Sequence, residues 1–354
     1  MDRMTEARAL RRCQQGLTLV ELLVALAVGL IVAIAAVASL VVARVGFTSV
    51  DSSTELRENA RFAATLIQRV VDESGFQDVA GGQFPTVSDQ TQWPSVRGYD
   101  NAVLPFDPNN PSAAPAGFPA PGTIAAGSRP GSCGAVTDTS CLNGSDVLVV
   151  RYWGVSQPPG PGNPADGSVI NCAGGKEPER ATGPSYSVFS VALSVSGEPT
   201  LVCTYQDPSS GLWKTVALVT GVEAFQVLYG TWGVTAGNCS GPPVDLNSNL
   251  PIAQQMDTYL TAADMQGPTG DCPNNWARVR TLRIGLLLRG IPGTAVVAAA
   301  TAASVPVLGM PLARYFAGDD QQDPGSKLGV PADGRLRTQM VFTVALRNLQ
   351  QARP

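Results

Sequence analysis

The longest apolar segment of this chain lies near its N-terminus. The segment from Leu22 to Ala43 carries no charged side chain. As an α-helix it would be about 33 Å long, enough to cross a ~30 Å hydrocarbon core. The apolar run begins near Gly16 and includes the acid Glu21. Because a carboxylate inside such a helix is costly, the pattern predicts a membrane-spanning helix with one functional acid.

Helical periodicity continues beyond Arg44. Charged and polar side chains occupy one face, and Gly75 is a residue type that commonly ends a helix. Apolar side chains recur every three or four positions on the other face, at Leu56, Ala60, Ala63, Ile67 and Val71. These positions predict one helix from Leu17 to about Ser74. Its first half would face lipid or other subunits, and its second half would pack on a globular domain.

The rest of the chain favours strands over helices. Residues 77–132 are rich in Pro, Gly, Ser and Ala and are expected to form an irregular surface segment. Strand patterns follow at Asp146–Trp153, Ser185–Ser194, Thr200–Gln206, Trp213–Val219, Val222–Trp232, Arg278–Arg289 and Met340–Arg347. The expected fold class is α+β, with one long N-terminal helix (a transmembrane half plus an amphipathic half) packed on an antiparallel β-rich C-terminal domain.

A second membrane span must also be considered, because the stretch Gly290–Ala313 is uncharged and long enough to cross a bilayer as a helix. This stretch carries three prolines and is dominated by Ala, Thr, Ser and Gly. A loop with a short buried segment explains it better than a helix broken three times.

The distribution of charge indicates how the chain is oriented in the membrane and argues against one class of partner. Arg8, Arg11 and Arg12 precede the apolar run and assign the N-terminus to the cytoplasm, so the remaining chain would be periplasmic. The formal net charge is −4, and no Lys/Arg cluster lies beyond Gly16, which argues against nucleic acid as a partner.

The sequence contains no histidine, which excludes His-based catalytic triads and HExxH zinc sites. Gly174-Gly175-Lys176 lacks the remaining residues of a phosphate-binding loop. The acidic stretches 245–249 and 319–323 match no EF-hand loop and are interpreted as solvated loops. No carboxylate pair or nucleophile–base arrangement stands out, so we expect no catalytic residues, no cofactor and no enzymatic activity.

The cysteines point to disulfides rather than to a metal. Cys13 precedes the apolar run, and six cysteines follow it on the side assigned to the periplasm, where disulfides persist. No CxxC pair exists, so no zinc site is expected. Six cysteines allow 15 connectivities. Ordered by locality alone, the expected pairs are Cys133–Cys141, Cys172–Cys203 and Cys239–Cys272.

The segment Gly16-Leu17-Thr18-Leu19-Val20-Glu21 before an apolar helix resembles the signal of type IV prepilins and pseudopilins. The resemblance implies that a prepilin peptidase cuts after Gly16, that Leu17 becomes an N-methylated N-terminus, and that Glu21 serves subunit assembly. The family usually has Phe where this chain has Leu17. The implied divisions are a leader (1–16), a transmembrane and filament-core helix (17–43), its amphipathic continuation (44–76) and a β-rich periplasmic domain (77–354).

Further motifs resemble those of PilW-type minor pilins, in the same order along the chain. They are Glu55–Ala63 with Gly75-Phe76, Gly221–Gly230 (GVEAFQVLYG), Trp276–Arg289, and Val344–Asn348 (VALRN). The resemblance implies a single-pass inner-membrane protein that primes or enters a type IV pilus. Its implied partners are other minor pilins, the major pilin and a tip adhesin.

Two alternatives remain at this point. One is a pseudopilin of type II secretion. The other, from a different class, is an uncleaved membrane-anchored periplasmic module that binds a ligand through its Pro-rich loops. The second alternative predicts no cleavage at Gly16 and no role for Glu21.

Overall fold

A computed structural model describes residues 18–78, 94–103, 131–132, 142–160, 162–179, 183–241, 256–268, 272–295, 303–309, 323 and 325–348. The chain divides into two compact units, residues 1–50 and 51–354, and each is described by itself.

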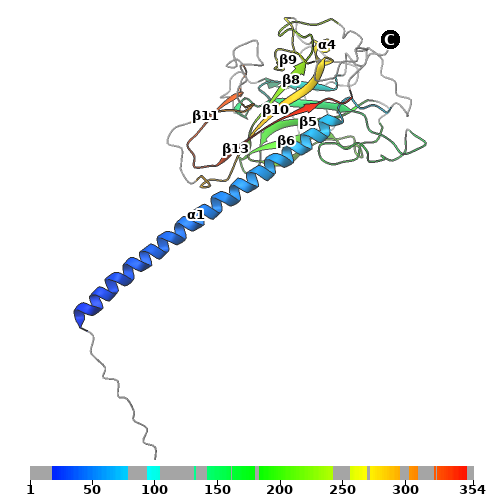
Figure 1. Ribbon diagram of the computed structural model, residues 1–354. Coiled ribbons are helices and arrows are strands. Elements are labelled where there is room, and N and C mark those ends of the chain that lie inside the picture. The colour runs from blue at the N-terminus through cyan, green and yellow to red at the C-terminus, as the bar shows by residue number, and fades with distance from the viewer. Residues whose placement is uncertain are drawn as a thin grey trace, which may run out of the picture. The chain divides into compact units, whose positions relative to one another are not determined.

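The helix α1 runs without interruption over the 54 residues Leu19–Asp72, close to the predicted bounds (Figure 1). At its start, the Thr18 hydroxyl accepts a hydrogen bond from the Glu21 backbone N–H at 3.3 Å, as an N-cap does. After its end, Gly75 adopts a φ of +70°, a conformation that favours glycine and stops a helix. Capping residues therefore fix both ends of α1.

In the N-terminal unit, every large apolar side chain of α1 from Leu19 to Val50 is exposed. Among the described residues, α1 alone is long and apolar enough to cross a membrane. A helix that is apolar on all sides requires lipid or other protein around it. The N-terminal part of α1 thus has the surface of a membrane-embedded or assembled helix.

The C-terminal unit (residues 51–354) contains two antiparallel sheets. The first has the strand order β1-β4-β5-β6-β7. Its strands are β1 (Val96–Tyr99), β4 (Val147–Tyr152), β5 (Ser185–Leu193), β6 (Pro199–Gln206) and β7 (Trp213–Thr220). The second has the order β13-β10-β8-β9. Its strands are β8 (Val222–Thr231), β9 (Thr258–Leu260), β10 (Val279–Arg289) and β13 (Arg337–Ala345).

Short elements accompany these sheets in the described part of the unit. Two further strand pairs are β2 (Ala102–Val103) with β3 (Gly131–Ser132), and β11 (Ala303–Pro306) with β12 (Lys327–Val330). Two short helical turns are η1 (Leu142–Gly144) and α4 (Pro273–Trp276). All seven predicted strands are present as β4, β5, β6, β7, β8, β10 and β13.

One hydrophobic core joins α1 to both sheets. Ala63 and Ile67 of α1, Leu148 and Phe189 of the first sheet, and Ile284 of the second are all fully buried in the same cluster. A second cluster lies at the junction of β8, β10 and β12 and contains Ala224, Leu287 and Leu328. The last residues of α1 therefore form part of the domain core rather than its surface.

The uncharged stretch 290–313 does not form a helix where it is described. Residues 303–306 form β11, and Val307 and Leu308 behind it are fully buried. Val307 packs in the cluster with Leu287, and Leu308 packs against Leu228 and Tyr259. This is the expected loop with a short buried segment.

Candidate functional site

The N-terminus of α1 carries the candidate assembly acid. Glu21 lies in the first turn and is exposed. Its backbone N–H, not its carboxylate, makes the capping bond to Thr18. Within the described part of the chain, no basic side chain pairs with this carboxylate. Negative charge near a helix N-terminus is favourable. Gly16 and Leu17 lie outside the described residues.

The second part of α1 packs through small side chains. Ala60 and Ala63, from the motif Glu55–Ala63, are almost completely buried. Alanine leaves little bulk between a helix and the surface on which it packs, so the backbones can approach closely. On the outer face Arg61 and Glu58 form an exposed ion pair at 3.0 Å. The motif therefore combines a close-packing face with a solvated one.

The C-terminal motif VALRN holds the end of α1. The Asn348 side-chain amide donates to the backbone carbonyls of Asp72 and Ser74 at 3.3 and 3.2 Å. These are carbonyls that the end of a helix leaves unsatisfied. A Cβ atom at Gly75 would lie 2.6 Å from the Asn348 carbonyl oxygen. Glycine is therefore required there by space as well as by its positive φ.

An arginine–carboxylate network links strands of the second sheet. Two of its members, Glu223 and Arg289, belong to the motifs Gly221–Gly230 and Trp276–Arg289. Glu223 of β8 accepts hydrogen bonds from Arg337 of β13 at 2.7 and 3.0 Å and from Arg289 of β10 at 3.2 Å. The network has six members: Glu198, Glu223, Arg289, Asp333, Arg335 and Arg337. The network lies at one end of the second sheet, where β8 and β13 begin and β10 ends.

The same network shifts the pKa values of its outer acids. Hydrogen bonds from Arg335 and then Arg289 lower the pKa of Glu198. A bidentate pair with Arg337 lowers the pKa of Asp333 to about 2. Both acids are thus held ionised in the folded chain.

Two of the three expected disulfides are present. Cys172 joins Cys203 of β6, and Cys239 joins Cys272, with Cα–Cα distances of 6.1 and 5.1 Å. A Cβ atom at Gly267 would lie 2.6 and 2.8 Å from the sulfur atoms of the second pair. Cys133 and Cys141 lie outside the described residues, so their pairing stays a prediction.

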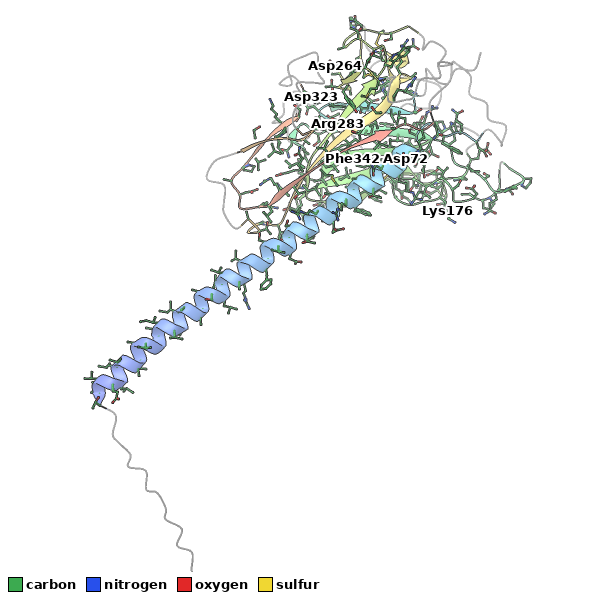
Figure 2. The ribbon with its side chains drawn as sticks, viewed as in Figure 1. Asp72, Lys176, Asp264, Arg283, Asp323 and Phe342 are labelled. Atoms are coloured by element: carbon green, nitrogen blue, oxygen red, sulfur yellow. A yellow bond between two sulfur atoms is a disulfide. The ribbon has the colours of Figure 1, made fainter. Side chains whose placement is uncertain are left out.

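Four acids that no sequence pattern singled out interact in the C-terminal unit. Asp100, Asp146, Asp264 and Asp323 act on one another electrostatically, although they come from distant parts of the sequence. Asp264 and Asp323 lie at the same end of the unit in Figure 2. Of the acidic stretch 319–323, expected as a solvated loop, only Asp323 lies within the described residues; its side chain is half-buried, and burial raises its pKa to about 8. No spacing in the sequence signals this cluster, because each acid comes from a different segment.

Comparison with known proteins agrees with these features. Residues 11–37 match the model of the prokaryotic N-terminal methylation motif, and residues 188–348 match the model of Type IV Pilus-assembly protein W. The first match covers Glu21, and the second covers the arginine–carboxylate network and Asn348. The chain is therefore a type IV pilin-like protein. Within that class, residues 188–348 are similar to the PilW type of pilus-assembly proteins.

Among solved structures, the type IV-like pilin TTHA1219 from Thermus thermophilus is similar to this chain. The two share 17% identity with a TM-score of 0.31, over 59% of this chain and 80% of the other. No curated protein matches the sequence.

Proposed function

We propose that this protein is a minor pilin that is processed at the inner membrane and then assembled. Residues 17–43 would anchor it, with the C-terminal unit in the periplasm. The prepilin peptidase would cut after Gly16, and the new N-terminus at Leu17 would be methylated. The observation that carries the proposal is the prepilin signal followed directly by the continuous helix α1.

The chemistry of assembly rests on Glu21. Cleavage creates an α-amine on Leu17, one helical turn before the acid. A helix does not fold its own terminus back over so short a distance, so the amine of one subunit would meet the carboxylate of its neighbour. In a bundle of parallel helices this contact lies in a low-dielectric interior, where pairing offsets the cost of burying each charge.

The proposed role is structural, without catalysis. The subunit would prime filament growth or enter the filament together with other minor pilins and the major pilin, and a tip adhesin is a further proposed partner. The exposed apolar surface of α1 in the N-terminal unit supports this role, because it needs either lipid or other helices to cover it.

A substitution at the cleavage position tests the proposal. Gly16→Val places a β-branched side chain where the peptidase must approach the backbone closely, so we expect the leader to stay attached. Gly29→Val is the matched control, because a side chain at Gly29 meets no atom within 4 Å. Immunoblots and intact masses of membrane-extracted protein should show a longer Gly16→Val product and a normally processed Gly29→Val product.

The same samples separate the alternatives. An uncleaved binding module would give full-length protein for the wild type and both variants, which would contradict the proposal. A type II secretion pseudopilin would be cleaved but would be absent from sheared surface pili, where we expect the processed wild type to be found.

A further inference from the structure

Strand β13 lies at one edge of the second sheet. On one side it pairs with β10 along all nine of its residues, without a register shift. On the other side, its outer edge, no described strand pairs with it, because the strand order of the sheet is β13-β10-β8-β9. The backbone N–H and C=O groups along the outer edge can therefore accept a further strand.

The other edges of the two main sheets carry features that discourage strand pairing. The edge strands β1 and β9 are only four and three residues long. The edge strand β7 has eight residues, and its Lys214 forms an ion pair with Asp207. The pairing of β7 with β6 is also interrupted by a register shift between Leu201 and Val202. Short length, lysines and bulges are the means by which edge strands avoid pairing with other chains.

Strand β13 has none of these protective features. The segment Thr338–Leu346 (TQMVFTVAL) contains no charged residue, proline or glycine. Arg337 at the start of the strand is held by Glu223 and Asp333, so its charge is neutralised within the domain. A regular strand of nine residues presents about 30 Å of edge to a partner. The edge of β13 is therefore long, regular and uncharged.

The hydrophobic core also reaches the surface along β13. Met340, Phe342 and Val344 alternate along the strand and therefore share one face. On this face they pack in the cluster that contains Ile67 of α1 and Ile284 of β10. Val344 is buried, whereas Met340 and Phe342 (labelled in Figure 2) are only half-buried. An added strand with apolar side chains on this face would complete their burial.

We propose that the outer edge of β13 binds an extended, uncharged segment of a neighbouring protein in the assembled pilus. The segment would add a strand to the second sheet and place apolar side chains beside Met340 and Phe342. The edge itself specifies this occupant, because only another extended chain can bond to a row of backbone N–H and C=O groups along its length. A helix cannot do so, because its backbone groups bond within the helix. This inference rests on the proposed function and adds a second contact to the one made by α1.

Photo-crosslinking determines the shape of the occupant. Thr343 and Ala345 are exposed and lie on the same face of β13. With p-benzoylphenylalanine in place of either residue of the full-length chain, we expect adducts in sheared pili. Their sites on the partner should lie two residues apart, because same-face positions of paired strands advance together. Sites three or four residues apart would identify a helix, and adducts within the same chain would identify an internal cover. Either result would overturn the proposal.

Hydrogen exchange of the wild-type chain tests whether the edge is paired. In the detergent-extracted subunit, the β13 amides that point away from β10 should exchange quickly, because they alternate with the amides bonded to β10. In sheared pili these amides should exchange at least about tenfold more slowly. Equal slowing of β7 (Trp213–Thr220) would indicate general burial in the filament and would contradict the proposal. Protection that rises with concentration in detergent would identify a second copy of this chain and would also contradict it.

A matched pair of variants measures what the edge contributes to assembly. Ala345→Lys puts a charge on the edge of β13 and should lower incorporation into pili about tenfold. Ala217→Lys makes the same change at an exposed position of β7 and should leave incorporation unchanged. Processed wild type in pili with fast-exchanging β13 amides, and equal incorporation of the two variants, would overturn this inference alone. Absence of the processed wild type from pili would overturn the proposed function and this inference with it.

Discussion

Replacing Glu21 with Ala is expected to remove this protein from filaments while leaving the membrane-anchored subunit intact. The helix cap survives, because it uses the backbone N–H of residue 21. Insertion into the membrane should be at least as good as in the wild type, since a charge is removed from the apolar run. Processing after Gly16 should also be normal.

The defect in Glu21→Ala should appear only when subunits assemble, because the amine of a cleaved subunit would then be buried without its acid. An uncompensated buried charge costs roughly 3 kcal/mol or more. We therefore expect recruitment to partner pilins about a hundredfold weaker, with few surface filaments that contain the subunit. Glu21→Gln should behave similarly, because it keeps the shape and removes only the charge.

Pull-down of partner pilins and quantification of the subunit in sheared pili measure this effect. Glu55→Gln is the matched control, because it neutralises an exposed acid on the same helix. If both Glu21 variants are recruited and incorporated as well as Glu55→Gln, then Glu21 is an incidental acid and the assembly mechanism proposed for it is incorrect.

The largest expected effect on folding comes from Glu223. Its side chain is 5% exposed and is the shared acceptor of Arg289 and Arg337. Glu223→Ala leaves both guanidinium groups without this partner at the edge of the second sheet. Removing one member of a buried ion pair typically costs about 3–5 kcal/mol. We expect a destabilisation at the lower end of that range, about 3 kcal/mol, because Arg289 and Arg337 keep Glu198 and Asp333 as partners but lose the contacts made from β8.

Chemical unfolding of the full-length chain in detergent measures the loss. Glu58→Ala removes one partner of an exposed ion pair, and surface pairs contribute about 0–1 kcal/mol. Glu198, at 30% exposure, should give an intermediate result. Equal stabilities for Glu223→Ala and Glu58→Ala would mean that the network adds nothing to the fold.

The arginine–carboxylate network should make the stability of the C-terminal unit depend on pH. The lowered pKa of Asp333, about 2, gives stabilisation that is present above pH ~4 and lost as the pH falls toward 2. The network therefore contributes to the stability of the C-terminal unit at neutral pH and loses part of that contribution in strong acid.

Long periodic patterns were sufficient to predict α1 and the seven main strands. The bounds of α1 differ only slightly from the predicted Leu17 and Ser74, because Thr18 and Gly75 set the caps. Strand β1 was missed because Val96–Tyr99 is short and lies in a Pro- and Gly-rich region. Its extended form depends on pairing with β4, which no local pattern signals.

The contacts between motifs could be predicted only in part. Charged residues at the ends of apolar strands, such as Glu223 and Arg289, were visible as motif residues, but their pairing depends on the strand order. The proximity of Asp100 and Asp146 was not predictable, because it depends on the pairing of β1 with β4, in which Tyr99 lies opposite Val147. Locality was enough for the two observed disulfides, Cys172–Cys203 and Cys239–Cys272, because each closes a comparatively short loop.

The intact mass of the wild-type protein extracted from membranes tests the central claim most directly. The account predicts a chain that begins at Leu17, lacks the leader Met1–Gly16 and carries one additional methyl group at its N-terminus. Reduction should add two hydrogens for each disulfide, including Cys172–Cys203 and Cys239–Cys272. A mass for a chain that still begins at Met1 or Met4 would contradict the account.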